Sequence, residues 1–407
     1  MDSMRDPFGA GHQTRRRTGP AGLHDPPLTI AATPLTVDAD GTPAILRPRV
    51  KPEHRPHRYP DGTVRVGGEI YGLAAEISDP RGWVWAALTL MDGTIAVPQI
   101  VARLNLLFPE LSARQAESLV RQLIRSGYVE DAAAEPPRDL TARELDRYSR
   151  NHAYFRRADL VPRTHGWEAQ LALKNAHVVV VGLGGTGSHV AWALTAAGVG
   201  HLHCVDPDVV ELSNLSRQVL YAEADVGLFK VDVALRRLRQ VNSDVAVSGD
   251  RTRVVSAARL GRLVRGADML ALCADEPGGH RLRVWANRVC ARAGIPWAGG
   301  GYSGPLVTVG VYGPGGTCYE CYSATEGARR RPGTPVDLGG PGVLATSAGL
   351  SGHLLAHLVI ARLTGVPPVP PGRVIGVNLI APDQHIDISH PPRADCHICG
   401  DPRGDTA

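Results

Sequence analysis

Residues 178–187 read VVVVGLGGTG, a run of valines followed at once by a glycine-rich turn. Successive β-branched residues are typical of a parallel strand that is buried on both faces. Glycines adopt positive φ angles and let a ligand approach the backbone, and the helix that we predict from about Ser188 would direct its free N–H groups at a phosphate. The stretch therefore predicts a strand, turn and helix that bind a nucleotide. The glycines of this turn are Gly182, Gly184, Gly185 and Gly187.

An acidic residue follows the next predicted strand, which runs from His201 to Val205. Asp206 comes about twenty residues after the turn, where a carboxylate can accept hydrogen bonds from ribose hydroxyls. A GxGxxG turn with such a residue suits NAD as well as ATP, because the pattern marks dinucleotide sites of several kinds. These two features leave the nucleotide open.

Two cations then favour ATP. Arg217 lies in the segment ELSNLSRQ at 211–218, and Lys230 begins a predicted helix farther along. Permanent positive charges suit a triphosphate, whose charge must be held while its α-phosphorus is attacked, and a dehydrogenase has no such requirement. Each cation alone could be a solvated surface charge. Together, at this spacing after the turn, they indicate phosphate binding.

Four of the seven cysteines form two CxxC pairs, Cys318 with Cys321 and Cys396 with Cys399. A CxxC turn presents two thiolates to one ion, and two such turns complete a tetrahedral structural zinc site. A redox dithiol is the alternative, but the presence of two pairs favours zinc. The ion would join the end of the chain to its middle.

The chain from about 147 to 400 resembles the ThiF/MoeB/HesA family, bacterial relatives of ubiquitin-activating enzymes. The family's RYxRQ opening stands here as RYSRN at 147–151, its phosphate turn at 182–187, and its NLxRQ element as NLSRQ at 214–218. The resemblance implies an α/β fold, a Rossmann-like doubly wound sheet with a structural zinc. It also implies that ATP adenylates the C-terminal carboxylate of a small protein or peptide.

The resemblance implies a role for each matched residue. Asp206 would hold the ribose, and Arg150 would reach the triphosphate of the partner subunit in a homodimer. Asp275, from the family's DN element, would position Mg²⁺. Here the chain departs from the family, because Glu276 replaces the asparagine and residues around 277–279 are inserted. The residues implied to bind ATP are Asn214, Arg217, Gln218 and Lys230, and the implied catalytic set is Arg217, Lys230, Asp275 and Arg150.

A cysteine that many family members carry is missing. It takes the acyl group as a thioester, and residues 323–352 contain no cysteine. The resemblance then implies that the acyl-adenylate is captured by an amine, a sulfur donor or a group on the same peptide. The basic run from Arg329 to Arg331, within the segment to Pro335, is expected to be a mobile loop. It could cover the active site or contact an acidic peptide, and a solvated charge run is the default.

Composition agrees with a catalytic domain plus a smaller module. The chain has 407 residues, 43% of them hydrophobic, which suffices for two cores. The net charge of +4 is too small to imply a nucleic-acid partner. No apolar run approaches a membrane span and the N-terminus lacks a hydrophobic signal region, so we expect a cytoplasmic protein. Reduced thiols there favour metal over disulfides.

The first third of the chain is organised differently. Residues 1–58 are rich in Pro, Arg and His, and we expect most of them to be disordered. Residues 59–131 predict a winged-helix-like α+β module, 132–146 a linker, and 401–407 a tail. The module's predicted strands and helices lie at 63–66, 69–73, 82–91, 98–108, 112–126 and 127–130.

This module resembles the PqqD-like peptide-recognition element of ribosomal peptide biosynthesis, on the pattern LMDGT…GYVED. The resemblance implies that a leader peptide pairs with an edge strand between Val64 and Leu73. A module that only packs on the catalytic domain or forms the dimer is the alternative. DNA binding is disfavoured because Glu110 and Glu117 offset the arginines of the third helix.

We therefore expect an ATP-dependent adenylyltransferase that activates the C-terminal carboxylate of a leader-recruited peptide in ribosomal peptide natural product biosynthesis. It would use ATP, Mg²⁺ and Zn²⁺, and a partner modifying enzyme could follow it. One alternative is a sulfur-carrier activator of the thiamin or molybdopterin type, whose substrate ends in Gly-Gly. The other is a non-catalytic scaffold that delivers a leader peptide to a partner cyclodehydratase.

Overall fold

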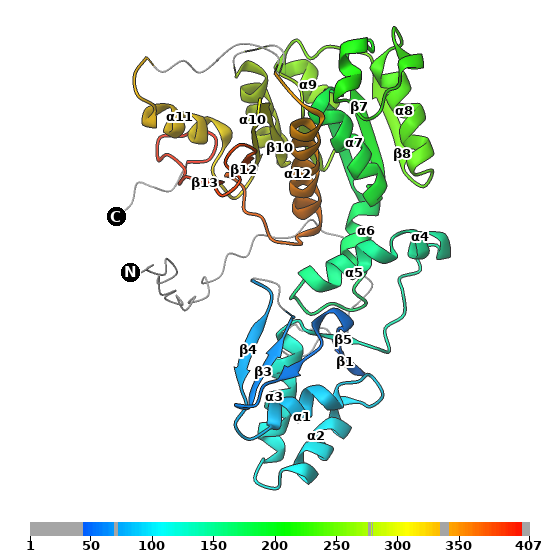
Figure 1. The fold of residues 1–407 in the computed structure, drawn as a ribbon, viewed down its shortest axis with the longest axis vertical. Coiled ribbons are helices and arrows are strands. Elements are labelled where there is room, and N and C mark those ends of the chain that lie inside the picture. Colours follow the sequence, from blue (N-terminus) through cyan, green and yellow to red (C-terminus); the bar gives the residue numbers. More distant parts are fainter. Residues whose placement is uncertain (1–43, 69–71, 276–277, 279, 334–341, 401–407) are drawn as a thin grey trace, which may run out of the picture. The chain divides into compact units, whose positions relative to one another are not determined.

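The computed structural model describes residues 44–68, 72–275, 278, 280–333 and 342–400 (Figure 1). The strands are β1 Pro48–Val50, β2 His57–Arg58, β3 Thr63–Val66, β4 Ala75–Ser78, β5 Val129–Asp131, β6 His177–Val181, β7 His201–Val205, β8 Ala246–Asp250, β9 Met269–Leu272, β10 Trp297–Ser303, β11 Leu306–Tyr312, β12 Arg373–Asn378 and β13 His385–Ser389. The α-helices are α1 Trp83–Leu90, α2 Val97–Leu107, α3 Ala113–Arg125, α4 Ala142–Arg147, α5 Ser149–Ala158, α6 Glu168–Asn175, α7 Gly185–Ala197, α8 Lys230–Val241, α9 Ala257–Leu263, α10 Arg281–Ala293, α11 Tyr319–Arg329 and α12 Ala345–Thr364. None of the helices in these described ranges is long and apolar enough to cross a membrane.

An eight-stranded mixed sheet forms the centre of the second part of the chain. Its strand order is β13-β12-β11-β10-β9-β6-β7-β8. Strands β10, β9, β6, β7 and β8 are parallel to one another. Strands β11, β12 and β13 follow β10 in the sheet, each antiparallel to the strand before it. The chain leaves β6 toward β7 on one side and later returns to β9 on the other. This reversal is the topological switch point at which open α/β sheets bind ligands.

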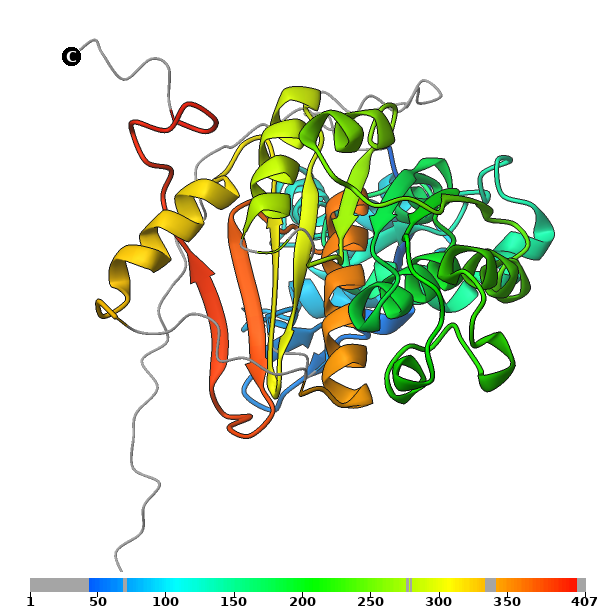
Figure 2. The same cartoon turned by 90° about the horizontal axis from the view of Figure 1, so that it is seen from above.

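Helices cover both faces of this sheet, so the α/β Rossmann-like prediction is confirmed. One core joins α7, α8 and α12 to one face through residues such as Val178, Leu194 and Val359. The second core joins α9 and α10 to the other face through Val179, Leu260 and others. Figure 2 shows α12, in orange, lying along the strands of the sheet. The alternating valines of β6 thus enter both cores, as a strand buried on two faces requires.

Small residues let α12 approach α7 closely. A side chain on Gly352 would meet Cβ of His189 at 2.4 Å and the carbonyl oxygen of Thr186 at 2.7 Å. Ser351 and Thr186 join their hydroxyls by a buried hydrogen bond of 2.7 Å. The long helix therefore lies directly against the first turn of α7 and holds that turn in place.

Residues 44–131 form a module with its own core. Strand β1 pairs with β5, and β2, β3 and β4 form a separate antiparallel sheet in that order. Buried residues from β3 and all three helices make up the core, including Val64, Leu88 and Ile100. Ser112 caps α3 by accepting the N–H of Gln115 at 3.3 Å.

The elements of this module follow the predicted ones with three differences. Strands β1 and β2 lie within the segment 1–58 that we expected to be largely disordered, of which the structure describes 44–58. Strand β3 at 63–66 pairs with both β2 and β4, so the expectation of an edge strand between Val64 and Leu73 is wrong for Val64 to Val66, which lie in the centre of this sheet. The strand expected at 69–73 lies partly outside the described residues. Helix α4 occupies the end of the expected linker, because Thr141 and Glu144 form a capping box at its start. Residues 1–43 and the predicted tail 401–407 also lie outside the described part.

Candidate functional site

The glycine-rich turn lies between β6 and α7 at the carboxyl ends of the parallel strands. Gly182 has a φ of 92°, and a side chain there would meet the backbone nitrogen of Ala274 at 2.8 Å. A methyl group on Gly187 would lie 1.8 Å from the carbonyl oxygen of Gly182. Helix α7 begins at Gly185, and its N-cap Gly184 has no side chain that could cap it. The first N–H groups of α7 are therefore available to a ligand.

Asp206 ends β7 beside this turn. Its carboxylate accepts hydrogen bonds from the N–H groups of Leu183 at 2.7 Å and Asp208 at 2.9 Å. The residue is 4% exposed, and this burial raises the pKa of its carboxyl group above the usual range. The two backbone donors fix the orientation of the carboxylate, so it presents its remaining lone pairs to a ligand such as a ribose.

Lys230 is the first residue of α8 and is buried beside the same strand end. Its ammonium group lies 3.2 Å from the carboxylate of Asp208, and its backbone N–H donates to the carbonyl oxygen of Asp208 at 3.0 Å. The other carboxylate oxygen of Asp208 lies 3.5 Å from Arg253. Asp208 therefore connects the predicted ribose-binding residue to the predicted phosphate-binding lysine, although the sequence pattern did not single it out.

The segment 212–218 supplies three further side chains from a short 3₁₀ turn. Asn214 accepts the N–H of Glu211 at 3.1 Å, and Arg217 donates to the carbonyl oxygen of Ser213 at 2.9 Å. Nε of Arg217 and Oε1 of Gln218 are buried and have no hydrogen-bond partner within the described part of the chain. These polar atoms remain available to a bound group.

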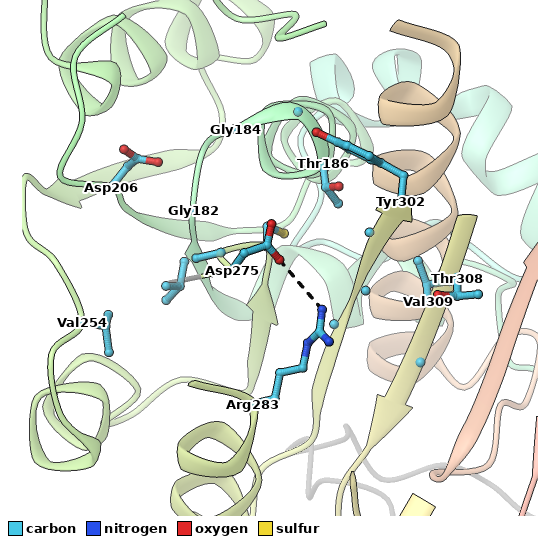
Figure 3. Close-up of a pocket in the computed structure, with 18 of the residues that line it drawn as sticks. Gly182, Gly184, Thr186, Asp206, Val254, Asp275, Arg283, Tyr302, Thr308 and Val309 are labelled. Atoms are coloured by element: carbon cyan, nitrogen blue, oxygen red, sulfur yellow. Dashed lines mark ion pairs between the residues drawn. The ribbon is translucent and has the colours of Figure 1, made fainter. Parts of the chain in front are cut away.

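These elements enclose a cavity of about 1060 Å³ (Figure 3). Its size suits a nucleotide together with the end of a second substrate, because single small-molecule sites reach about 1,000 Å³. Of the residues predicted to bind ATP or to act on it, all except Gly187 and Arg150 line this cavity. Those that do are Gly182, Gly184, Gly185, Asp206, Asn214, Arg217, Gln218, Lys230 and Asp275.

Asp275 follows β9 on the opposite side of the switch point. Its side chain is 92% exposed, and Arg283 of α10 lies 3.9 Å away (Figure 3). Such a carboxylate has oxygen atoms free for a metal ion, which fits a Mg²⁺ ligand. Glu276 and the inserted residues Pro277 and Gly279, which make this loop different from the family pattern, lie outside the described residues.

Several residues of the cavity wall were not singled out by the sequence. Trp297, Tyr312, Tyr319 and Tyr322 form an aromatic side, in which Trp297 and Tyr312 lie 4.7 Å apart between ring centroids. His280 accepts or donates a hydrogen bond of 2.5 Å with the Tyr319 hydroxyl and has a positive φ of 58°. A signal was present only for Tyr319 and Tyr322, because each directly follows a cysteine of the first CxxC pair.

The basic run begins inside α11, because Arg329 is the last residue of that helix, so the expectation of a mobile loop is wrong for Arg329. Arg330 lines the cavity, and Arg329 pairs with Glu326 at 3.3 Å. Part of the predicted loop therefore contributes to the cavity, where a solvated charge run had been the default. Residues 334 and 335 lie outside the described ranges.

The structure does not bring Arg150 to the cavity of its own chain. It lies exposed on α5, and no wall of the cavity comes from that helix. A role for Arg150 at the triphosphate is therefore compatible only with the partner subunit that the resemblance implied.

Four cysteines gather at the start of α11 and the end of the described chain, and their sulfur atoms all lie within 4.8 Å of one another. Sulfur–sulfur distances are 3.7 Å between Cys318 and Cys396 and 3.6 Å between Cys321 and Cys399. Disulfides need about 2.05 Å. Tetrahedral coordination with Zn–S bonds of about 2.3 Å separates the sulfurs by about 3.8 Å. The donor set therefore fits a zinc ion.

The fold and the cavity define a Rossmann-like domain of the nucleotide-binding type, with its cavity at the switch point. The chain belongs to the ThiF family, which it matches over residues 154–398. This places the matched region among domains of the adenylyltransferase type, since relatives that match it are named as adenylyltransferases.

Two such relatives show how far the likeness extends. Adenylyltransferase and sulfurtransferase MOCS3 of Bos taurus is 37% identical over 270 residues, which cover 65% of this chain and 56% of the relative. The chain thus spans little more than half of that protein. Molybdopterin-synthase adenylyltransferase of Escherichia coli is 31% identical over 264 residues, covering 64% of this chain and 99% of the relative.

Among solved structures, E. coli MccB with AMPCPP and MccA is similar with a TM-score of 0.66 and 25% identity. The likeness covers 87% of this chain and 99% of MccB. Since the ThiF match begins at residue 154, this wider likeness includes part of the N-terminal region.

Proposed function

We propose that this protein is an ATP-dependent adenylyltransferase that activates the C-terminal carboxylate of a peptide. One observation carries the proposal, namely that the glycine turn, Asp206 and the cations Arg217 and Lys230 all line one cavity. A triphosphate needs both the backbone donors and the cations, whereas hydride transfer to a nicotinamide needs no such pair. The names of the relatives support the same reaction class.

In the proposed step, a carboxylate oxygen of the peptide attacks the α-phosphorus of ATP. The bond from that phosphorus to the oxygen bridging to the β-phosphate breaks, and its electron pair leaves with pyrophosphate. No side chain becomes covalently bonded. The chain acts by alignment and charge, because the N–H groups of α7, Arg217 and Lys230 face the oxygens on which charge accumulates.

Two metal ions complete the proposal. Asp275 would hold Mg²⁺, which neutralises charge on the phosphates when bound. Cys318, Cys321, Cys396 and Cys399 would hold Zn²⁺ as a structural ion. Zinc at this place links α11 to the chain beyond β13 and takes no part in the chemical step.

A peptide substrate is supported by the likeness to MccB, whose structure was solved with MccA. We propose that the N-terminal module recruits a leader peptide at β4, since β4 pairs with β3 on one side and ends the described three-stranded sheet. An extended peptide can add to such an edge by backbone hydrogen bonds. Biosynthesis of a ribosomal peptide natural product is the setting that this arrangement favours.

Release of the acyl-adenylate without a thioester is supported by the state of the remaining thiols. Cys204 and Cys290 are buried in the cores, and burial raises the pKa of each thiol to about 12. Cys273 lines the cavity, but burial raises the pKa of its thiol even more. Thiols in this state are poor nucleophiles at neutral pH.

A homodimer is supported by exposed apolar residues on the part of the chain that carries Arg217. Six of them lie in the segment between β7 and α8, with exposed fractions from 38% to 68%. They are Val209, Leu212, Val219, Val226, Leu228 and Phe229. A second subunit covering this surface would place residues of its own, Arg150 among them, near the triphosphate.

Activation of a sulfur-carrier protein is the second candidate. It is favoured by the molybdopterin-synthase relative, almost all of which this chain covers. The size of this chain speaks against it, because the match spans 99% of that relative and leaves about a third of this chain unmatched.

ATP–pyrophosphate exchange with purified, zinc-loaded protein tests the proposal, because exchange reports adenylation without knowledge of the acceptor. Peptides encoded beside the protein and a carrier protein ending in Gly-Gly are compared as substrates. Exchange that depends on a leader-bearing peptide would support the proposal. Exchange only with the carrier would establish the second candidate, and tight peptide binding without ATP binding would leave a scaffold.

A further inference from the structure

Tyr302 extends from the end of β10 over the glycine turn. An ideal Cβ on Gly185 would lie 2.5 Å from the hydroxyl oxygen of Tyr302 and 3.2 Å from its ring carbons. Figure 3 shows the ring lying across the start of α7, with its hydroxyl toward Gly184. Gly185 therefore needs to be glycine for a reason besides the ligand, since Tyr302 occupies the place of a side chain.

The strand explains how this side chain reaches the turn. Residues 299–301 of β10 are glycines that line the cavity without side chains. Side chains alternate along a strand, so Tyr302 lies on the same side as Ala298, which packs in the core beneath α7 and α12. Tyr302 is thus the first side chain after an open stretch, directed at the anion-binding end of α7.

Groups that can donate a hydrogen bond to an anion lie close to the hydroxyl. Tyr302 lies beside the first N–H groups of α7, and Nε2 of Gln218 lies 3.9 Å from the Cβ position of the neighbouring Gly184. No hydrogen bond of the Tyr302 hydroxyl occurs with any described residue. N–H donors at a helix start, with a hydroxyl and an amide beside them, are an arrangement that suits a phosphate group.

We propose that Tyr302 is a substrate-contacting residue whose hydroxyl donates a hydrogen bond to the phosphate chain of ATP. This rests on the proposed function, because it assumes that ATP occupies the cavity. The hydroxyl keeps its proton during the reaction and strengthens its bond as pyrophosphate forms. Loss of a hydrogen bond to a charged group costs about 1.5–3 kcal/mol, or roughly tenfold or more in affinity.

Affinity for ATP with Mg²⁺, measured by calorimetry on the full chain, tests the proposal without a peptide. Tyr302→Phe keeps the ring and should weaken binding tenfold or more, and Tyr302→Ala should weaken it at least as much. Tyr154→Phe, on the exposed face of α5, is the matched control and should bind as the unchanged protein does. Unfolding midpoints verify that each variant is folded.

Two results would overturn the inference. Tyr302→Phe could bind ATP as tightly as the unchanged protein, or only Tyr302→Ala could bind weakly, which would mean that the ring packs and the hydroxyl does nothing. Both outcomes are distinct from failure of the proposed function, which would appear as absence of ATP binding in the unchanged protein.

Discussion

The distance from Gly187 to the carbonyl oxygen of Gly182 leaves room for a hydrogen atom and nothing larger. This contact brings α7 against the turn, so the N–H groups of its first turn reach the cavity. Glycine ordinarily destabilises a helix, but here the absence of a side chain lets α7 approach the backbone of Gly182 closely. The requirement could be predicted from the GxGxxG spacing, because that pattern specifies a tight turn and helix packing.

Gly187→Ala should lower the free energy of unfolding by about 3 kcal/mol and abolish ATP binding, because its methyl group has no space. Gly261→Ala is the control. It lies in α9 with Val289 as its nearest neighbour at 3.8 Å, so it should be neutral or stabilise by about 0.5–1 kcal/mol. Urea unfolding of both variants measures the difference, and equal effects would contradict the packing argument.

Lys230→Ala removes the cation that Asp208 holds beside Asp206. Exchange of pyrophosphate should fall by about 10²–10³, as expected for loss of one charge-stabilising group. The zinc content should be unchanged, because the cysteine cluster lies in another part of the chain. Retained exchange in this variant would show that the phosphate assignment is incorrect.

At the scale of helices and strands, the sequence was most informative where neighbouring residues determine an element. The strand and turn at 178–187, the cap at Ser112 and the helices near it could be predicted, because local spacing determines them. Asp208 and Tyr302 could not be singled out. Their positions depend on strands β7 and β10 lying on opposite sides of the switch point, and strand order is a property of the assembled sheet.

A titratable side chain of α5, His152, stacks on Trp167, the residue that precedes α6. The ring of His152 lies 4.0 Å from that of Trp167, nearly parallel to it. Burial, assisted by the charge of nearby Arg156, lowers the pKa of His152 from 6.5 to about 4. Since the unfolded chain binds this proton more tightly, the free energy of unfolding should fall as the pH decreases from about 6.5 to about 4.

His152→Asn removes this contribution. Between pH 7 and pH 4, the free energy of unfolding of the variant should decrease by on the order of 2 kcal/mol less than that of the unchanged protein. Urea unfolding at several pH values measures this difference. His385→Asn, at an exposed position on β13, should leave the pH dependence unaltered. If the free energies of unfolding of His152→Asn and of the unchanged protein changed with pH in the same way, other groups would be responsible for the pH dependence.

At the scale of the whole molecule, the cysteine cluster joins segments that lie far apart in the chain. Cys399→Ser should release zinc and lower the melting temperature by about 10 °C, because loss of a structural metal costs several kcal/mol. His397→Ala, next to the cluster but exposed, should keep both the metal and the melting temperature. Metal analysis together with thermal unfolding checks both variants, and loss of zinc from His397→Ala would make that histidine a ligand.

The close packing of α12 on α7 has a consequence for how the coding sequence tolerates interruption. Every residue lining the cavity except Val374 lies before residue 331. A stop codon after α11 would therefore leave almost the complete set of cavity residues in the product. It would nevertheless remove the helix whose Ser351 and Gly352 support the first turn of α7. Such a truncated allele should behave as a null, because it lacks α12 together with β12, β13, Cys396 and Cys399, although Val374 alone of the described residues in this part lines the cavity.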